Sequence, residues 1–154
     1  MGDESISFEV TGTLRGWTAP SFSRKTGHAY KPNWERVQRE SIQAQAMPHR
    51  PTDPWTGPLA VTLMFQVPIP RSWARWRREV APGHPAVGKP DLDNMVKAVL
   101  DALKGMFFLD DTQVASLMAS NHYSAGAPGV RIGLVQMDAL PATKADWLRR
   151  GGAE

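Results

Sequence analysis

Apolar residues occupy every second position in two stretches of the chain, and this period of two is typical of a half-buried strand. From Ser5 to Thr11 the apolar residues are Ile6, Phe8 and Val10. The same alternation runs from Leu59 to Val67. We therefore expect the first two strands of the protein at these positions.

Two more strands are expected in the last third of the chain, over Gln113 to Tyr123 and over Val130 to Met137. The segment between them, Ala125 to Gly129, is rich in Gly and Pro, which favour tight turns. We expect these two strands to pair with each other as a hairpin.

A period near 3.6 residues indicates two helices. Helix formers run from Trp34 to Met47, after Asn33, which caps helices well, and before Pro48, which ends them. The stronger signal covers Leu92 to Lys104, and Gly105 is positioned to terminate that helix. Its apolar residues form one stripe, which consists of Leu92, Val96, Val99, Leu100 and Leu103.

The remaining segments are rich in Pro, Gly and polar residues and predict connections. Gly12 to Pro32 is expected to be an ordered loop or a loose hairpin, and Pro68 to Pro90 a long, partly mobile loop. The elements predict an α+β fold with a mixed sheet of about four strands and two main helices, in the order β-α-β-α-β-β. We expect one domain over residues 1–138 and a tail over 139–154, with a short helix from Thr143 to Arg150.

With 154 residues, 42% of them hydrophobic, the chain is long enough for one domain with its own core. No apolar run approaches the roughly 20 residues of a membrane span, and Met1 to Val10 lacks the pattern of a secretory signal. We therefore expect a cytoplasmic protein with no membrane partner. The sequence has no cysteine, so any metal must bind oxygen or imidazole ligands.

The net charge of +3 hides an uneven distribution, because five of the 15 acidic residues fall between Asp91 and Asp111. A basic surface around an acidic site suits a phosphate polymer, although a solvated charged loop fits the same charges. Trp73 and Trp76 lie among the basic residues and could stack on exposed bases, although core packing is the more common role. The candidate DNA-binding residues are Arg24, Lys25, Lys31, Arg71, Arg75, Arg77, Arg78 and Lys89.

The candidate chemistry begins where the chain enters the second helix. Asp91 and Asp93 lie two positions apart, so that both carboxylates can face one cation. Asp93, Lys97 and Asp101 then follow at i+4 spacing and form a polar stripe opposite the apolar one. We expect this polar face to look outward or across a cleft.

Asp110 and Asp111 follow the helix after a short apolar connection, and we expect the chain to turn back there so that acids from both ends of the helix meet. Converging carboxylates are costly unless a cation neutralises them, and these oxygen ligands favour Mg²⁺, with Mn²⁺ as a substitute. Such a site can hydrolyse a phosphodiester bond, and a lysine on the same face stabilises the developing charge. The number of metal ions stays open.

Each of these residues also has a purely structural interpretation. Asp91 and Asp93 could be acids favoured by the positive end of the helix dipole, and Lys97 could be the i+4 partner of Asp93. Asp110 and Asp111 could simply start a turn.

Three short segments carry a recognisable combination of acids, lysine and apolar residues. They are Lys89-Pro90-Asp91-Leu92-Asp93-Asn94, Lys97-Ala98-Val99-Leu100-Asp101-Ala102-Leu103 and Leu109-Asp110-Asp111-Thr112-Gln113-Val114. Together they closely resemble the signature of the RusA family of Holliday junction resolvases. The order of strands and helices agrees loosely from Ile6 to Met137. One departure is the segment Gly12 to Ser23, where the family often has a run of Lys, Arg and Pro and this chain has only Arg15.

The resemblance implies a RusA-like fold and a homodimeric, Mg²⁺-dependent endonuclease that makes paired nicks across a four-way DNA junction. Such proteins act in DNA recombination and repair and are often encoded by phages or prophages. The family's catalytic aspartates fall on Asp91, Asp93 and Asp111 and its catalytic lysine on Lys97, and Asp110 joins the three aspartates as an expected metal ligand. The expected partners are branched DNA and a second copy of the chain.

Two alternatives stay open at the level of the sequence. The protein could be a broader structure-selective nuclease that cuts flaps or forks without strict junction symmetry. It could also be a non-catalytic protein that binds DNA junctions and whose carboxylates only order the fold.

Overall fold

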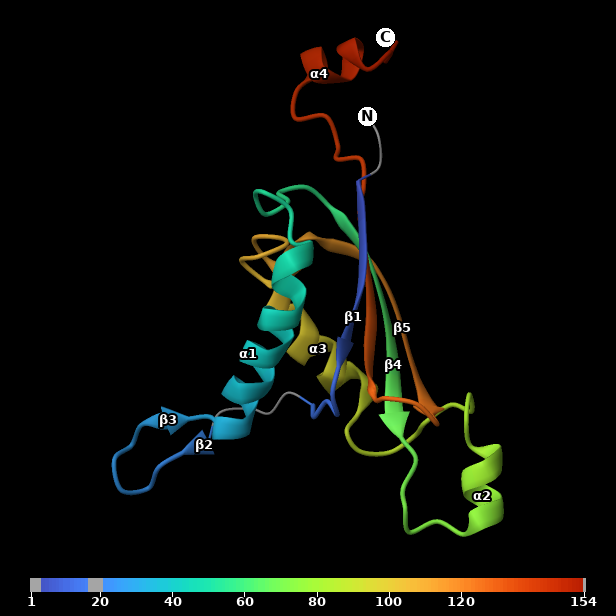
Figure 1. Ribbon diagram of the computed structural model, residues 1–154. Coiled ribbons are helices and arrows are strands. Elements are labelled where there is room, and N and C mark those ends of the chain that lie inside the picture. Colours follow the sequence, from blue (N-terminus) through green and yellow to red (C-terminus); the bar gives the residue numbers. More distant parts are fainter. Residues whose placement is uncertain (1–3, 17–20, 154) are drawn as a thin grey trace.

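The computed structural model describes residues 4–16 and 21–153, and its central element is a four-stranded mixed sheet (Figure 1). Helices α1 and α3 lie side by side and cover one face of this sheet (Figure 1). The main elements are β1 (Ser5–Thr11), α1 (Asn33–Ala46), β4 (Leu59–Pro68), α3 (Leu92–Leu103), β5 (Val114–Ser124) and β6 (Gly129–Gln136). The expected α+β fold and its β-α-β-α-β-β order are therefore confirmed.

Several shorter elements connect or extend these main elements. The strands β2 (Ser21–Phe22) and β3 (Ala29–Tyr30) pair antiparallel, so the segment after β1 contains a small hairpin. The remaining short elements are η1 (Met47–His49), α2 (Arg75–Val80), η2 (Asp111–Gln113) and α4 (Lys144–Arg149). None of the helices that the structure describes has the length and apolar character needed to cross a lipid bilayer.

The alternation of apolar and polar residues gives the sheet one buried face and one exposed face. In β4, Leu63 and Phe65 are buried while their neighbours Thr62 and Met64 are exposed. α1 and α3 supply the opposite side of the core. The residues that meet there include Phe8, Val10, Ile42, Ala46, Leu59, Val61, Met95, Val99, Leu103, Ile132 and Leu134.

The expected hairpin between the last two strands is wrong, because β4 lies between them. The strand order is β1-β6-β4-β5, with β6 antiparallel to both β1 and β4 and with β5 parallel to β4. The physical reason lies in burial. β4 is apolar enough to occupy a central position with neighbours on both sides, whereas every residue of β5 is half-buried or exposed and suits an edge.

The two main helices begin and end within a residue of the expected positions. In α3 the buried stripe consists of Met95, Val96, Val99, Ala102 and Leu103, while Leu92 and Leu100 are only partly buried. Gly105 follows α3 with a φ of 85°, a conformation that suits glycine and ends the helix. Asn33 is not the cap of α1, because Pro32 occupies that position and Asn33 accepts a hydrogen bond from Arg36 within the helix.

The long segment between β4 and α3 has more structure than a loop. It contains α2, and its second half is hydrogen-bonded to the edge strand β5. The Gly83 amide donates to the Tyr123 carbonyl at 2.9 Å, the Tyr123 amide donates to the His84 carbonyl at 3.0 Å, and the Ala86 amide donates to the Asn121 carbonyl at 2.9 Å. These bonds hold residues 83–86 against the sheet just before α3 begins.

The tail after residue 138 carries the expected short helix, α4. The Thr143 hydroxyl accepts a hydrogen bond from the Asp146 amide at 3.1 Å and caps this helix. The tail extends beyond the end of the sheet (Figure 1).

Candidate active site

Asp91 and Asp93 lie at the start of α3, where the sequence predicted a pair of metal ligands. Asp91 is the N-terminal cap residue of the helix, but within the described residues its carboxylate makes no capping hydrogen bond. It is instead paired with the Lys89 ammonium at 2.9 Å. Asp93 is exposed in the first turn. The Asp91 carboxylate is therefore not fully explained as a structural cap of the helix.

The polar face of α3 continues from this end as the spacing predicts. Lys97 is exposed one turn after Asp93, and Asp101 is half-buried one turn further on. Val96 and Val99 on the opposite face are buried in the core. A lysine thus lies on the same face of the helix as Asp93.

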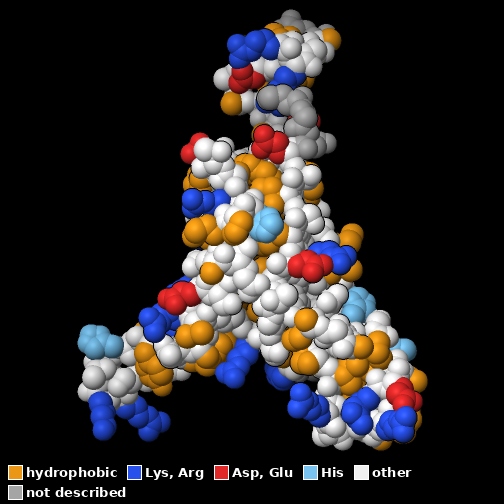
Figure 2. Space-filling view, viewed as in Figure 1, with side chains coloured by type: hydrophobic (Ala, Val, Ile, Leu, Met, Phe, Trp, Pro, Cys, Tyr) orange, Lys and Arg blue, Asp and Glu red, His pale blue; other side chains and the backbone are white. Residues whose placement is uncertain are grey.

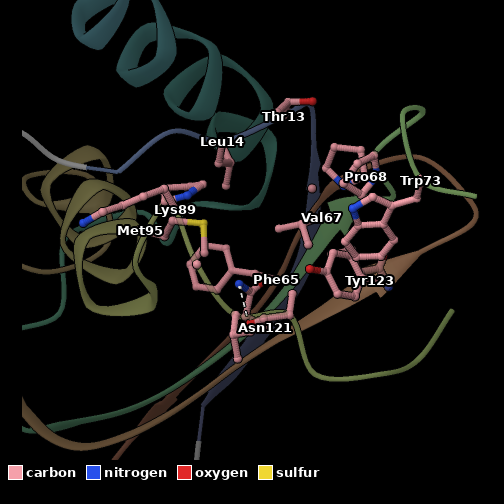
Figure 3. Close-up of a pocket in the computed structure, with 17 residues that line it drawn as sticks. Thr13, Leu14, Phe65, Val67, Pro68, Trp73, Lys89, Met95, Asn121 and Tyr123 are labelled. Carbon is pink, nitrogen blue, oxygen red and sulfur yellow. Dashed lines mark hydrogen bonds between the residues drawn. The ribbon is translucent and has the colours of Figure 1, made fainter. Parts of the chain in front are cut away.

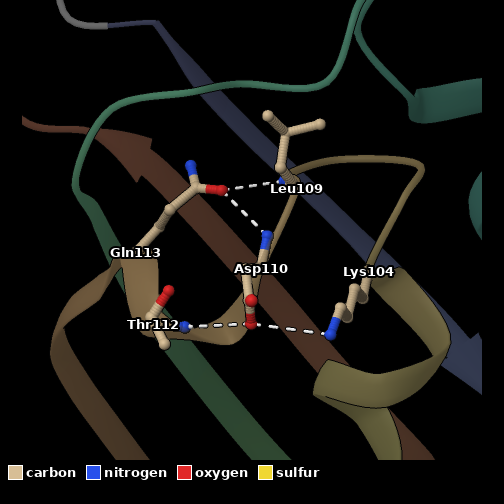
Figure 4. A network of polar contacts seen from close by, with 5 residues as sticks. All are labelled: Lys104, Leu109, Asp110, Thr112 and Gln113. Atoms are coloured by element: carbon tan, nitrogen blue, oxygen red, sulfur yellow. Dashed lines mark hydrogen bonds and ion pairs between the residues drawn. The ribbon is translucent and has the colours of Figure 1, made fainter.

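Asp110 and Asp111 lie beyond the other end of α3, in a tightly built turn. The Asp110 side chain accepts a hydrogen bond from the Thr112 amide and pairs with the Lys104 ammonium at 3.5 Å (Figure 4). Gln113 completes the capping box, because its side-chain oxygen accepts from the amides of Leu109 and Asp110 at 2.8 and 2.9 Å (Figure 4). The two carboxylates are thereby held at the start of β5.

The side chains of Asp110 and Asp111 shift each other's pKa in opposite directions. The pKa of Asp110 is lowered, first because the Asp111 side chain donates a hydrogen bond to it and second because the Thr112 amide does. The pKa of Asp111 is raised, first by that same hydrogen bond and then by desolvation and the negative charge of Asp110. Two neighbouring carboxylates repel each other, and a divalent cation bound between them would relieve this repulsion.

Within one chain, the acids at the two ends of α3 do not come together, so the expectation that they meet there is wrong. The helix has 12 residues and is therefore about 18 Å long at ~1.5 Å per residue. The charged groups that affect the pKa of Asp111, besides Asp110, are Lys104 and Asp101, at its own end of the helix. Among the residues that the structure describes, no three metal-binding side chains are grouped.

The apolar connection after α3 explains this separation. Phe107 and Phe108 are fully buried, and the Trp55 amide donates a hydrogen bond to the Phe107 carbonyl at 2.8 Å. Gly105 also donates a backbone hydrogen bond to the Phe108 carbonyl at 2.7 Å. The chain therefore inserts two rings into the core at the end of the helix. Asp110 and Asp111 lie in the turn at that end, before β5 leads the chain back toward the start of α3.

Basic side chains gather on two separate parts of the molecule. Arg24 and Lys25 lie in the turn of the β2–β3 hairpin, and Arg75, Arg77 and Arg78 lie on α2. Figure 2 shows these as two projections at one end of the molecule, with a gap between them. The remaining candidates Lys31, Arg71 and Lys89 lie on the segments that lead into α1, α2 and α3.

Some of these basic side chains have partners within the chain. Arg75 pairs with Glu79 at 2.8 Å, and Lys31 pairs with Glu35 at 3.3 Å. The Arg77 guanidinium lies over the Trp73 ring, 3.7 Å from its centroid. Part of the positive charge that was expected to bind DNA therefore already has a partner within the chain.

Two features near the acids do not follow from the motifs in the sequence. Gln113 belongs to the third motif, but its role comes from its place three residues after Asp110, which is the spacing of a capping box. A cavity beside Lys89 is lined in part by Asn121 and Tyr123, which come from the edge strand β5. No local pattern identifies these two residues, because the cavity is lined by several segments that are distant in the sequence.

Comparisons with known proteins identify the family of this chain. The family model described as Endodeoxyribonuclease RusA matches residues 12–135. A protein of Bacillus subtilis (strain 168), "Uncharacterized protein YqaN", is 30% identical over 127 residues, which cover 79% of this chain and 89% of that protein. The matched region contains both groups of acids, Lys97 and the whole sheet except β1 and the last residue of β6. The chain therefore belongs to the RusA family of endodeoxyribonucleases.

Proposed function

We propose that this protein is a Mg²⁺-dependent endonuclease that resolves four-way DNA junctions by paired nicks. The observation that carries the proposal is the carboxylate pair Asp91 and Asp93 at the start of α3, accessible to solvent and on the same helix as Lys97. Membership of a family of DNA endonucleases supports the reaction, and the two basic projections support a DNA substrate with more than one arm.

The donor chemistry of the acids fits Mg²⁺ or Mn²⁺. The available ligands are carboxylate oxygens, and the sequence has no cysteine. When bound, such a cation polarises the phosphate and lowers the pKa of a water molecule. We assign Asp91, Asp93, Asp111 and Asp110 as ligands, and Lys97 as the group that stabilises charge on the phosphate or on the leaving oxygen.

The separation of the acids makes a second copy of the chain part of this proposal. One chain presents Asp91 and Asp93 at one end of α3, and Asp110 and Asp111 at the other. In a two-fold symmetric dimer, each end of α3 can face the opposite end in the partner, which gives two complete sites from two chains. Two sites related by symmetry would make two nicks in a junction that is itself two-fold symmetric.

The direct test is cleavage of an end-labelled four-way junction in Mg²⁺ by the Asp93→Asn variant. We expect loss of cutting, because the amide removes one anionic ligand, with junction binding retained. Asp138→Asn is the matched control, since Asp138 is an exposed acid outside both groups. If Asp93→Asn cuts as fast as the unchanged protein, the site assignment is wrong.

The same assay separates the two alternatives. A broader nuclease would cut forks and flaps as fast as four-way junctions, so these substrates are compared side by side. A protein that only binds junctions would retain them in a gel and give no products with any divalent ion.

A further inference from the structure

A cavity of about 420 Å³ lies beside the start of α3, between the ends of β4 and β5 and the segment that precedes the helix (Figure 3). This volume is within the range of about 300–1,000 Å³ that is typical of small-molecule sites. Lys89, which pairs with Asp91, is one of the lining residues. The cavity therefore adjoins the Asp91–Asp93 end of the proposed active site.

The walls of the cavity are mainly apolar and aromatic. Phe65, Trp73 and Tyr123 line it, and the rings of Trp73 and Tyr123 meet edge to face at 5.1 Å (Figure 3). The Arg77 guanidinium lies on the Trp73 ring, so a positive charge accompanies the aromatic wall. Flat aromatic walls with a cation beside them suit a flat ring that is attached to a phosphate chain.

Asn121 lines this cavity, and its side-chain amide lacks a full set of hydrogen-bond partners among the described residues. Its side-chain oxygen is buried and, among the described residues, has no hydrogen-bond partner. Within the part of the chain that the structure describes, its side-chain nitrogen reaches only the Ala86 carbonyl, at 3.5 Å, which is the limit for a hydrogen bond. A buried amide that lacks its partners is costly, and the cost is removed if a ligand pairs with it.

We propose that the cavity binds one unpaired nucleobase of the DNA substrate, with the base against Trp73 and its polar edge on the Asn121 amide. The proposal rests on the proposed function for the identity of the polymer. An amide can accept from an exocyclic amine and donate to a ring nitrogen, so it pairs with the edge of a base. Turning the amide toward the base breaks only the long hydrogen bond to Ala86.

The position of the cavity gives this binding a consequence for cleavage. Lys89 lines the cavity and holds Asp91 at 2.9 Å, so a captured base brings its own phosphates to the start of α3. Bases at a branch point are more easily unstacked than bases within a duplex, which favours capture there. The protein should therefore select its cut position partly by the identity of one base near the branch.

The test uses four-way junctions that differ at one branch-adjacent nucleotide, which carries each of the four bases or no base. Affinity is measured in Ca²⁺ in place of Mg²⁺. For the unchanged protein we expect roughly tenfold weaker binding when the base is absent at one particular position, because stacking is lost. Asn121→Leu should still need a base there but discriminate roughly tenfold less among the four.

Two tryptophans in the same segment provide the matched control. Trp73 lines the cavity, whereas Trp76 is 68% exposed on α2. Trp73→Leu should remove the dependence on a base, and Trp76→Leu should keep it. Equal binding of every junction by the unchanged protein would overturn the proposal, and so would an unaltered base profile in Asn121→Leu.

A covalent measurement on the unchanged protein covers the case in which a variant fails to fold. A junction with 5-iododeoxyuridine at the selected position is irradiated, and the crosslinked peptide is identified by mass spectrometry. We expect attachment at Trp73 or Tyr123, and attachment only elsewhere would overturn the proposal. Base-dependent binding without cleavage in any divalent ion would support the base-binding cavity and contradict the proposed nuclease function. Cleavage without base dependence would support the nuclease function and contradict the base-binding cavity.

Discussion

The side-chain amide of Gln113 joins two parts of the chain that are distant in sequence. Its oxygen accepts from the Leu109 and Asp110 amides, and its nitrogen donates to the Trp55 and Gly57 carbonyls at 2.8 and 2.9 Å. All the hydrogen-bonding capacity of the amide is used. Gln113 thus positions the Asp110–Asp111 pair without belonging to it.

We expect Gln113→Ala to lower the free energy of unfolding by about 2–6 kcal/mol, because four hydrogen bonds of about 0.5–1.5 kcal/mol each are removed. Urea denaturation measures this change. Gln136→Ala is the control, since the Gln136 side chain makes an exposed hydrogen bond to Glu4. Similar destabilisation by both substitutions would show that the hydrogen bonds of Gln113 contribute no more to stability than an exposed hydrogen bond does.

Lys97 can be tested directly, because a catalytic role and a role as a surface ion-pair partner predict different effects of its substitution. We expect Lys97→Ala to reduce the rate of junction cleavage about 10²–10³-fold, as when a single donor to a transition state is removed. Single-turnover cleavage in saturating protein measures the rate, and gel retardation in Ca²⁺ measures the affinity, which should change little.

Lys144→Ala provides the comparison for Lys97→Ala, because Lys144 lies on α4 in the tail, outside the region that the family model matches. A slow Lys97→Ala enzyme that also binds the junction correspondingly more weakly would indicate a role in DNA binding alone.

Two elements, α2 and the β2–β3 hairpin, carry basic side chains away from the sheet. Arg78 on α2 and Arg71 before it are candidates for phosphate binding, whereas Arg75 and Arg77 already have partners in Glu79 and Trp73. If α2 contacts a DNA arm, its contribution should depend strongly on salt.

We expect the double substitution Arg71→Gln and Arg78→Gln to lower the slope of log affinity against log salt by about 1 for each phosphate that the protein no longer neutralises. Junction binding titrated between low and moderate salt gives this slope. Arg149→Gln with Arg150→Gln on the tail is the control and should leave the slope unchanged. An unchanged slope in the α2 variant would place the DNA away from α2.

The sequence predicted the positions of the strands and helices better than it predicted which strands pair with each other. Alternation located β1 and β4 closely, because a half-buried strand imposes its period on its own residues. The partner of a strand is not a local property. The turn after β5 suggested a hairpin, but a central position for the more apolar β4 buries more surface and satisfies more backbone groups.

The same distinction applies to the candidate site. The spacing of Asp93, Lys97 and Asp101 predicted a polar helix face, which the structure confirms because it follows from helix geometry alone. The position of Asp111 depends on where Phe107 and Phe108 insert into the core. That insertion involves Trp55, about fifty residues earlier, and no local pattern contains it.

At the scale of the whole molecule, each chain carries two separate groups of acids, one at each end of α3. If a site takes Asp91 and Asp93 from one chain and Asp111 from its partner, a dimer contains two sites and each chain contributes to both. If instead each site lies within one chain, each chain contributes to one site. Mixing two inactive variants distinguishes these arrangements.

We expect Asp93→Asn and Asp111→Asn to be inactive separately and to recover cleavage when they are denatured together and refolded. In a shared arrangement, the mixed dimer places both substitutions in one site and leaves the other site intact. About half of the dimers should be mixed, so nicking should return to about a quarter of the sites, as single nicks rather than paired ones. Refolding each variant alone is the control. No recovery from the mixture, with dimers present by size-exclusion chromatography, would contradict the shared site.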